Sequence, residues 1–188
     1  MAVLSVLALA ACSSPQPPPP AGDYYVYGSA EELVGASDLI VHGIVVGTQV
    51  QQSQARATIP ATPPPATSPP ATSPARVTGP RVVVTIVRLT VIDVFKGDVA
   101  VGDEIEVSQL GGRYRGVDYV DAGTTLLQVG QAGGYVLLLR RGPDGVYYLP
   151  NPQQAMFTLA GEAGLSGIGA NALDIATPAD LRALAAVP

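Results

Sequence analysis

Few side chains of this 188-residue chain could perform acid–base, nucleophilic or metal chemistry, and they do not form a motif. The chain has one histidine, His42, within an apolar run, and one cysteine, Cys12, close to its start. A zinc site needs several Cys, His or carboxylate ligands, whereas residues 23–188 contain one imidazole and no thiol. GLSGIG, at 164–169, lacks the glycine spacing of a nucleophile elbow. We therefore predict no catalytic residue, no metal and no cofactor, and a packed or half-exposed His42.

Carboxylates are the remaining candidates for chemistry, and they fall into two groups. One group surrounds a turn and consists of Asp98, Asp103, Glu104 and Glu106. Its spacing matches no calcium-binding loop, so a solvated acidic hairpin is the expected structure. The other group, Asp118 and Asp121, could act as the carboxylate pair of a glycan hydrolase, but a polar loop offers no apolar setting that would raise one pKa. An enzyme that uses these loop carboxylates is the alternative to a binding protein.

The stretch RYRGVDY, residues 113–119, has the composition of a binding loop. Glycines flank it, and no apolar pattern surrounds its Arg and Tyr side chains that would bury them. Tyr and Arg are enriched at recognition surfaces because each combines a large contact area with hydrogen-bonding groups. The opposing interpretation is that the two tyrosines fold back over the end of the domain. The predicted partner-binding residues are Arg113, Tyr114, Arg115 and Tyr119.

The charge of the chain argues against one class of partner. It has 10 Lys and Arg against 15 Asp and Glu, which gives a formal net charge of −5 at pH 7, and its arginines are scattered. Binding to nucleic acid needs clustered cations that neutralise the phosphates. We therefore expect no nucleic-acid partner.

The chain begins with MAVLSVLALAAC, an apolar run that ends in small residues directly before Cys12. The run is too short to span a bilayer and is typical of a signal-peptide core. LAAC, residues 9–12, resembles the lipobox of bacterial lipoproteins, which implies that residues 1–11 are removed and that the Cys12 sulfur carries a diacylglyceryl group. No Lys or Arg precedes the run, which favours a start codon upstream of Met1. The proline-rich residues 12–22 would form a semi-rigid tether between the lipid and the domain.

A lipidated N-terminus predicts where the protein works. We expect the lipid to hold it at the extracytoplasmic face of a cell membrane, with the domain exposed to the envelope. There it would be a non-catalytic module that binds an envelope protein or a cell-wall glycan. Two alternatives stay open: an envelope enzyme that uses the loop carboxylates, and a structural spacer whose proline-rich insertion is glycosylated.

β-Branched residues dominate the middle of the chain, which favours strands over helices. A Ser-x-x-Glu capping box at Ser29 predicts a helix over 30–36, and Thr177 predicts a C-terminal helix that begins at the following proline. The tandem PPATS repeat at 64–73 has no apolar periodicity, so residues 50–80 should form a disordered insertion between two strands. The predicted strands cover 38–50, 81–98, 104–110, 135–141, 146–149 and 155–161.

Three segments share a pattern with a known family: DLIVHGIVV at 38–46, LTVIDVFKG at 89–97 and LLQVGQAGGYVLLLRR at 126–141. They resemble the netrin/TIMP-like family of OB-fold barrels, which is found in many exported bacterial proteins. The resemblance implies a mainly β fold for residues 23–188, a small antiparallel OB-like barrel of five or six strands with short edge helices. Metalloprotease inhibition, the best-known activity of that family, uses an N-terminal cysteine at the barrel. It should not transfer, because Cys12 is distant from the barrel and has no disulfide partner.

Overall fold

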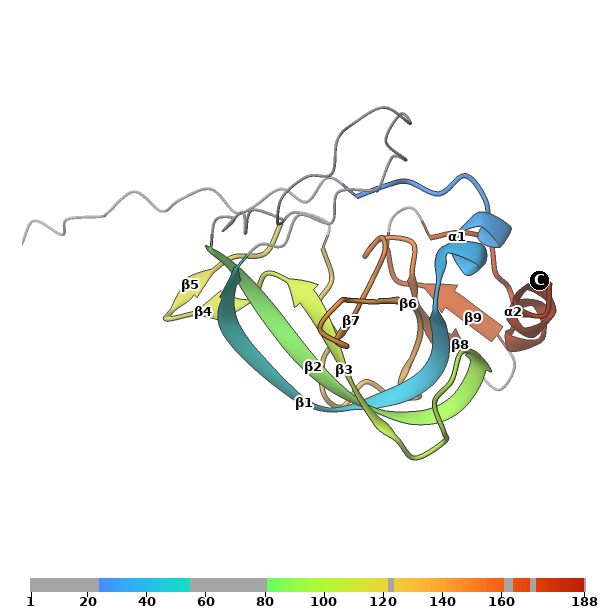
Figure 1. Ribbon diagram of the computed structural model, residues 1–188, viewed down its shortest axis with the longest axis horizontal. Coiled ribbons are helices and arrows are strands. Elements are labelled where there is room, and N and C mark those ends of the chain that lie inside the picture. Colours follow the sequence, from blue (N-terminus) through green and yellow to red (C-terminus); the bar gives the residue numbers. More distant parts are fainter. Residues whose placement is uncertain (1–23, 55–80, 122–123, 161–163, 170–171, 188) are drawn as a thin grey trace, which may run out of the picture.

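The computed structural model describes residues 24–54, 81–121, 124–160, 164–169 and 172–187. The chain forms one curved sheet, a separate two-stranded hairpin and two short helices (Figure 1). The helices are α1 (Ala30–Ala36) and α2 (Pro178–Ala185). The strands are β1 (Leu39–Gln54), β2 (Arg81–Lys96), β3 (Glu104–Leu110), β4 (Arg113–Tyr114), β5 (Val117–Asp118), β6 (Tyr135–Arg141), β7 (Tyr147–Tyr148), β8 (Met156–Ala160) and β9 (Gly164–Gly167).

The sheet has the strand order β1-β2-β3-β7-β6-β8-β9, and β1 also pairs with β6. The pairings therefore lead from β1 through β2, β3, β7 and β6 back to β1, and the sheet curls into a barrel-like form (Figure 1). β7 forms only two residue pairs with each neighbour, so the barrel is not fully closed. This mainly β, barrel-like fold with two short helices agrees with the prediction from the sequence. One pairing differs: β7 turns back from β6 and meets β3 in parallel, whereas the prediction is an all-antiparallel barrel.

β1 and β2 form a long curved ribbon that crosses the molecule (Figure 1). The register between the two strands shifts in the first half of β1. Such bulges let a long strand bend, and the length of the segment 81–98 predicts a bend of this kind. Gly43 lies at one shift, where a Cβ would clash with Leu89 and with the Thr90 carbonyl oxygen. The insertion begins later than predicted, because residues 50–54 pair with β2 and belong to β1.

The apolar core lies inside the curved sheet and under the helices. β6 is buried from Tyr135 to Leu139, and only its last two residues are exposed. In β3, Ile105 and Val107 are buried while Glu104 and Glu106 are exposed, as the alternation in the sequence predicts. Full burial of one large aliphatic or aromatic side chain contributes roughly 1.5–3 kcal/mol. The largest fully buried apolar side chains are Leu33, Leu39, Ile40, Leu89, Leu137, Leu138, Leu139, Met156, Phe157 and Leu181.

α1 forms where the capping box predicts it. The Ser29 hydroxyl accepts a hydrogen bond from the Glu32 N–H at 3.2 Å, and the Glu32 carboxylate accepts one from the Gly28 N–H at 2.8 Å. The carboxylate thus reaches one residue beyond the N-cap N–H that it usually binds. At the other end of α1, the Lys96 ammonium donates to the Val34 carbonyl at 2.8 Å, which places a positive charge at the helix C-terminus.

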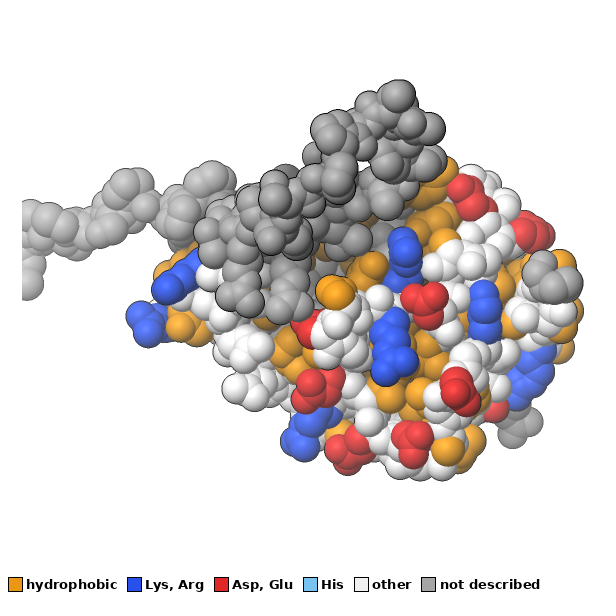
Figure 2. All heavy atoms as spheres, viewed as in Figure 1, with side chains coloured by type: hydrophobic (Ala, Val, Ile, Leu, Met, Phe, Trp, Pro, Cys, Tyr) orange, Lys and Arg blue, Asp and Glu red, His pale blue; other side chains and the backbone are white. Residues whose placement is uncertain are grey.

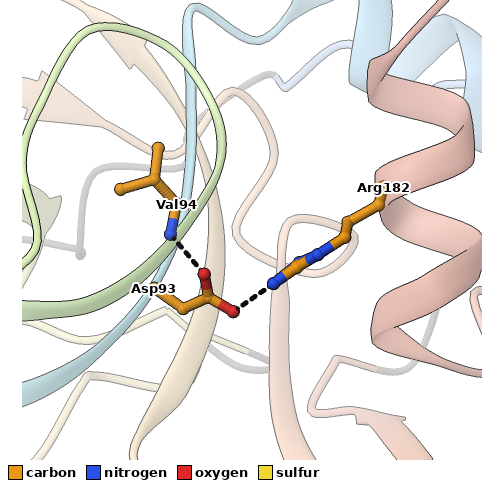
Figure 3. Close-up of polar contacts among 3 residues, drawn as sticks. All are labelled: Asp93, Val94 and Arg182. Atoms are coloured by element: carbon orange, nitrogen blue, oxygen red, sulfur yellow. Dashed lines mark hydrogen bonds and ion pairs between the residues drawn. The ribbon is translucent and has the colours of Figure 1, made fainter.

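α2 begins after its N-cap Thr177, as predicted, and an ion pair joins it to β2 (Figure 3). The Arg182 guanidinium donates to one carboxylate oxygen of Asp93 at 2.5 Å, and the other oxygen accepts from the Val94 N–H at 2.9 Å. The same guanidinium lies over the Phe95 ring, 4.5 Å from its centre. Polar contacts therefore fix both helices to the C-terminal end of β2.

Some predictions fall outside the residues that the structure describes. They are the signal peptide at 1–11, the lipidated Cys12, the tether at 12–22 and the PPATS repeat at 64–73. Among the described residues, none of the helices has the length and apolar character needed to cross a membrane.

Candidate functional site

RYRGVDY forms a β-hairpin at the end of the molecule opposite to the helices (Figure 1). β4 and β5 pair Arg113 with Asp118, and a second pair inside it leaves a two-residue loop of Arg115 and Gly116. Both loop residues have a positive φ, 50° and 83°, as the type I′ turn of a tight hairpin requires. The predicted binding loop is therefore a hairpin with a defined backbone.

Two glycines fix the base of this hairpin to the barrel. Gly112 and Tyr119 exchange two backbone hydrogen bonds, at 3.0 and 3.3 Å. Gly111 has a φ of 96°, and a Cβ there would clash with the Tyr119 carbonyl oxygen. The Gly111 carbonyl accepts a hydrogen bond of 2.7 Å from the Thr85 hydroxyl, and its N–H donates to the Val83 carbonyl at 2.8 Å. A side chain at either glycine would displace the hairpin from β2.

The side chains of the hairpin make an ion pair and a cation–π contact with one another. Arg113 Nε lies 4.0 Å from Asp118 Oδ1, and these side chains are 72% and 69% exposed. The Arg115 guanidinium lies 5.3 Å from the centre of the Tyr114 ring, within range of a cation–π contact. Figure 2 shows cationic side chains at this end of the molecule. The two tyrosines differ from the two arginines, because Tyr114 and Tyr119 are half-buried whereas Arg113 and Arg115 are exposed.

A pocket of ≈ 290 Å³ opens beside the hairpin. It is lined by Thr48 and Val50 of β1, Thr85 of β2, Gly112 and Arg113 at the hairpin base, and residues 126–129. The lining combines hydroxyl groups and a guanidinium with aliphatic surface, the mixture that fixes the orientation of a bound ligand. Since Arg113 belongs to both, the hairpin and the pocket form one continuous surface, which we call the hairpin site.

Gln109 holds one wall of the pocket, although the sequence motifs do not point to it. Its side chain is 4% exposed; Oε1 accepts a hydrogen bond from the Leu127 N–H at 2.8 Å, and Nε2 donates to the Thr125 carbonyl at 3.2 Å. A fully satisfied buried amide makes its surroundings rigid. The available signal is positional: Gln109 continues the inward-facing alternation of Ile105 and Val107, where an apolar residue is expected.

The first described residues are tied to the domain between the loop after β5 and the start of α1. Burial, and then the negative charge of Asp121, raise the pKa of Tyr24, so the chain enters the domain beside the loop that follows β5. The buried Gln154 then binds both backbone groups of Tyr27: its Oε1 accepts from the N–H at 2.9 Å, and its Nε2 donates to the carbonyl at 3.0 Å. Asn151 Nδ2 donates to the carbonyl of the preceding Tyr25 at 3.0 Å.

The residues considered for catalysis do not come together. His42 is half-buried, and its Nε2–H donates to the Gly133 carbonyl at 2.6 Å, so it holds a turn. Asp98, Asp103, Glu104 and Glu106 are exposed, as a solvated hairpin predicts. Within the described ranges, no three His, Cys, Asp or Glu side chains are grouped in a way that could hold a metal ion.

Comparison of the chain with protein families, with curated proteins and with solved structures finds no match. The function is therefore inferred from three features: the hairpin site, the barrel-like sheet that supports it and the N-terminal sequence.

Proposed function

We propose that the protein is a lipid-anchored, non-catalytic binding module on the extracytoplasmic face of a bacterial membrane. The hairpin site is its ligand-binding surface, and the ligand is an envelope protein or a cell-wall glycan. The observation that carries the proposal is a cluster of two exposed arginines, Arg113 and Arg115, around the half-buried Tyr114, on a hairpin whose base is bonded to the barrel.

The rigid presentation of these side chains supports a binding role. A type I′ loop, the Gly112–Tyr119 hydrogen bonds and the Thr85 hydroxyl hold the hairpin backbone before any ligand arrives. Little backbone entropy is then lost on binding, so more of the contact energy appears as affinity. The Arg and Tyr side chains themselves keep a large exposed area and several donors for a partner.

The N-terminal sequence supports the membrane anchor. LAAC at 9–12 has the residues of a lipobox, and two acyl chains are enough for stable attachment. A polyproline segment rises roughly 3 Å per residue, so residues 12–22 would hold the domain roughly 35 Å from the lipid. That distance would let the hairpin site meet partners in the envelope rather than the lipid surface.

The resemblance to the netrin/TIMP-like barrels is part of the same proposal. It is supported by the segments 38–46, 89–97 and 126–141, which supply the first half of β1, the second half of β2 and β6. The inhibitory role of that family is not carried over, because it needs a cysteine at the barrel and the described residues contain none.

A binding experiment with the full-length lipidated protein tests the hairpin site. The probes are purified cell-wall sacculi, by co-sedimentation, and intact envelopes, by formaldehyde cross-linking. The double variant Arg113→Ala, Tyr114→Ala should no longer co-sediment with the sacculi, or should no longer form the cross-linked product, depending on which probe the wild type binds. Arg140→Ala, an exposed arginine of β6 outside the hairpin site, is the matched control and should leave both unchanged. Equal binding by the wild type and the double variant would refute the role of the hairpin.

Intact mass spectrometry of the membrane-extracted protein tests the anchor. The expected mass is that of the chain from Cys12 onward plus a diacylglyceryl group, either with a third acyl chain on the Cys12 amine or without it. Cys12→Ser should release the protein from the membrane fraction while the domain stays folded. An unmodified thiol on a protein that partitions into water would overturn the anchor and the proposed location.

A further inference from the structure

We propose that the hairpin site binds its partner by β-strand addition: an extended, acidic segment of a protein pairs with the free edge of β1 at Thr48–Gln52. This inference rests on the proposed function and decides between its two ligands in favour of a protein. Four observations support it, namely an unpaired strand edge, the direction of its backbone groups, the adjoining pocket and the local charge.

The outer edge of β1 is paired over only part of its length. β6 pairs with β1 from Leu39 to Gly43, where Gly43 faces Tyr135. From Ile44 to Gln54, the described part of the structure contains no strand beside β1 except β2. An unpaired edge of this length presents a row of backbone donors and acceptors to any extended chain.

The backbone groups of Thr48, Val50 and Gln52 point to this free edge. On β2, the Val83 carbonyl accepts from the Gly111 N–H, and both backbone groups of Val91 bond to the turn before β3. Because these groups alternate along a strand, the backbone N–H and C=O groups of every second β2 residue from 83 to 91 point toward β3. Their partners in β1 have backbone groups that face away from β2, because opposite residues in an antiparallel pair either both face inward or both face outward. These partners include Gln52, Val50 and Thr48.

The pocket lies beside this part of β1, where the end of an added strand would be located. N-terminal to Tyr135, the chain leaves the edge of β1 through a turn in which the Gly134 N–H donates to the Gln131 carbonyl. His42 fixes this turn through its bond to Gly133, and Gln109 fixes residues 125–127. β1 and residues 126–129 consequently stay apart, with the ≈ 290 Å³ pocket between them.

The charge around this edge predicts an acidic partner. Arg113 lines the pocket and Arg115 follows on the hairpin loop. Arg88 lies across β1 at Gly47, and Arg81 faces the last residue of β1. Three carboxylates accompany these four arginines: Asp118 lies 4.0 Å from Arg113, Glu104 lies 4.0 Å from Arg88, and Glu106 faces Arg88 across β2 and β3. In a chain with a net charge of −5, this is a local concentration of positive charge.

A glycan and a second copy of the chain fit these observations less well. A sugar cannot match a regularly spaced row of alternating N–H and C=O groups, whereas a peptide backbone matches it by pairing. Two copies paired edge to edge would bring the same four arginines together, and like charges placed opposite each other are destabilising. The complementary occupant is an extended peptide with Asp or Glu near its ends and β-branched residues between them.

The test starts with a displayed library of random twelve-residue peptides, selected on the full-length protein. Selection should enrich peptides with β-branched residues at alternate positions and flanking Asp or Glu. One enriched peptide is then measured against two pairs of variants: Thr48→Pro with Thr48→Ala, and Gln52→Pro with Gln52→Ala. Proline removes the outward N–H that alanine keeps, so each proline variant should bind the peptide roughly tenfold or more weakly than its alanine partner does. Both positions are exposed, and thermal unfolding checks that the variants fold.

Changes to the peptide keep the test independent of any folding defect in the variants. Methylation of those peptide amides that would pair with β1 should abolish binding to the wild-type protein, and methylation of the intervening amides should not. Equal effects of the two methylation patterns, or equal affinities of proline and alanine variants, would overturn strand addition. A concentration-dependent dimer that Thr48→Pro abolishes would overturn it in favour of a second copy. If sacculi bind through Arg113 while Thr48→Pro has no effect, the proposed function holds and strand addition is wrong.

Discussion

The two ends of the barrel use the same kind of ion pair in opposite ways. At the helix end, Arg182 contacts Asp93 at 2.5 Å and stacks on Phe95, so its charge and its flat face are both occupied. At the hairpin end, Arg113 lies 4.0 Å from Asp118, and both side chains are largely exposed. The first arginine stabilises the docking of a helix, whereas the second keeps its donors accessible.

The remaining polar groups follow the same division. Buried amides at the helix side, such as Gln154, bind the backbone of the first described residues. Near the hairpin, Gln109 and Thr85 also bind backbone, but what they hold in place is the wall and base of an open pocket. One end is therefore built for stability, and the other is a supported surface whose outermost side chains contribute little to folding. Four predictions test this contrast.

The largest difference should appear when an apolar side chain is shortened at each end. Leu181 of α2 is fully buried, so Leu181→Ala should lower the free energy of unfolding by roughly 3 kcal/mol through lost burial and a cavity. Val129 at the pocket is 58% exposed, and Val129→Ala should change it by less than about 0.5 kcal/mol. Urea unfolding followed by circular dichroism measures both. Similar losses for the two variants would remove the distinction between a stable end and a binding end.

A smaller but sharper effect should separate two glycines of the hairpin. Gly111→Ala places a Cβ against the Tyr119 carbonyl at a φ of 96° and should cost roughly 2 kcal/mol, with the hairpin displaced. Gly116→Ala has a similar φ of 83° but open space around it, so it should cost only about 1 kcal/mol. Chemical unfolding gives the stabilities, and amide chemical shifts of residues 112–119 report the hairpin position. If Gly116→Ala proves the more disruptive, the base of the hairpin is not what fixes it.

The two arginine pairs provide the direct test of the comparison. Arg182→Ala removes the ion pair with Asp93 and the contact with Phe95, and it should lower the free energy of unfolding by about 1 kcal/mol, since both charges are partly exposed. Arg113→Ala should change it by only a few tenths of a kcal/mol, while it removes ligand binding. The thermal midpoints and the sacculus or peptide assay are measured on the same samples. The contrast fails if Arg113→Ala destabilises the protein as much as Arg182→Ala does.

Local signals in the sequence predict the helices and long strands because each depends on nearby residues. Ser29 and Thr177 mark the helix starts, and the apolar run 135–141 marks β6. The short strands β5 and β9 carry no such signal, since they have two and four residues in glycine-rich stretches. The parallel contact of β7 with β3 depends on barrel closure, which no local pattern encodes.

For the site, composition identifies the hairpin but not its surroundings. Arg113, Tyr114 and Arg115 stand out because nothing near them in the sequence would bury them. The pocket and the free edge of β1 arise only when residues 44–54, 112–113 and 126–129 meet in space. Gln109 also acquires its role only from the loop that folds over it.

The smallest predicted effect concerns acid, and it again belongs to the helix end. The Gly28 N–H, and then the Tyr25 hydroxyl, lower the pKa of the Glu32 carboxyl in the folded protein. A carboxyl with a lowered folded pKa stabilises the fold above its unfolded pKa of about 4.3, and this contribution is lost as the pH falls through the folded pKa. Glu32→Gln should therefore reduce the fall in thermal midpoint between pH 6 and pH 3, and Tyr25→Phe should reduce it less. Should Glu32→Gln leave that fall unchanged, the carboxylate does not tie the residues before α1 to the helix in solution.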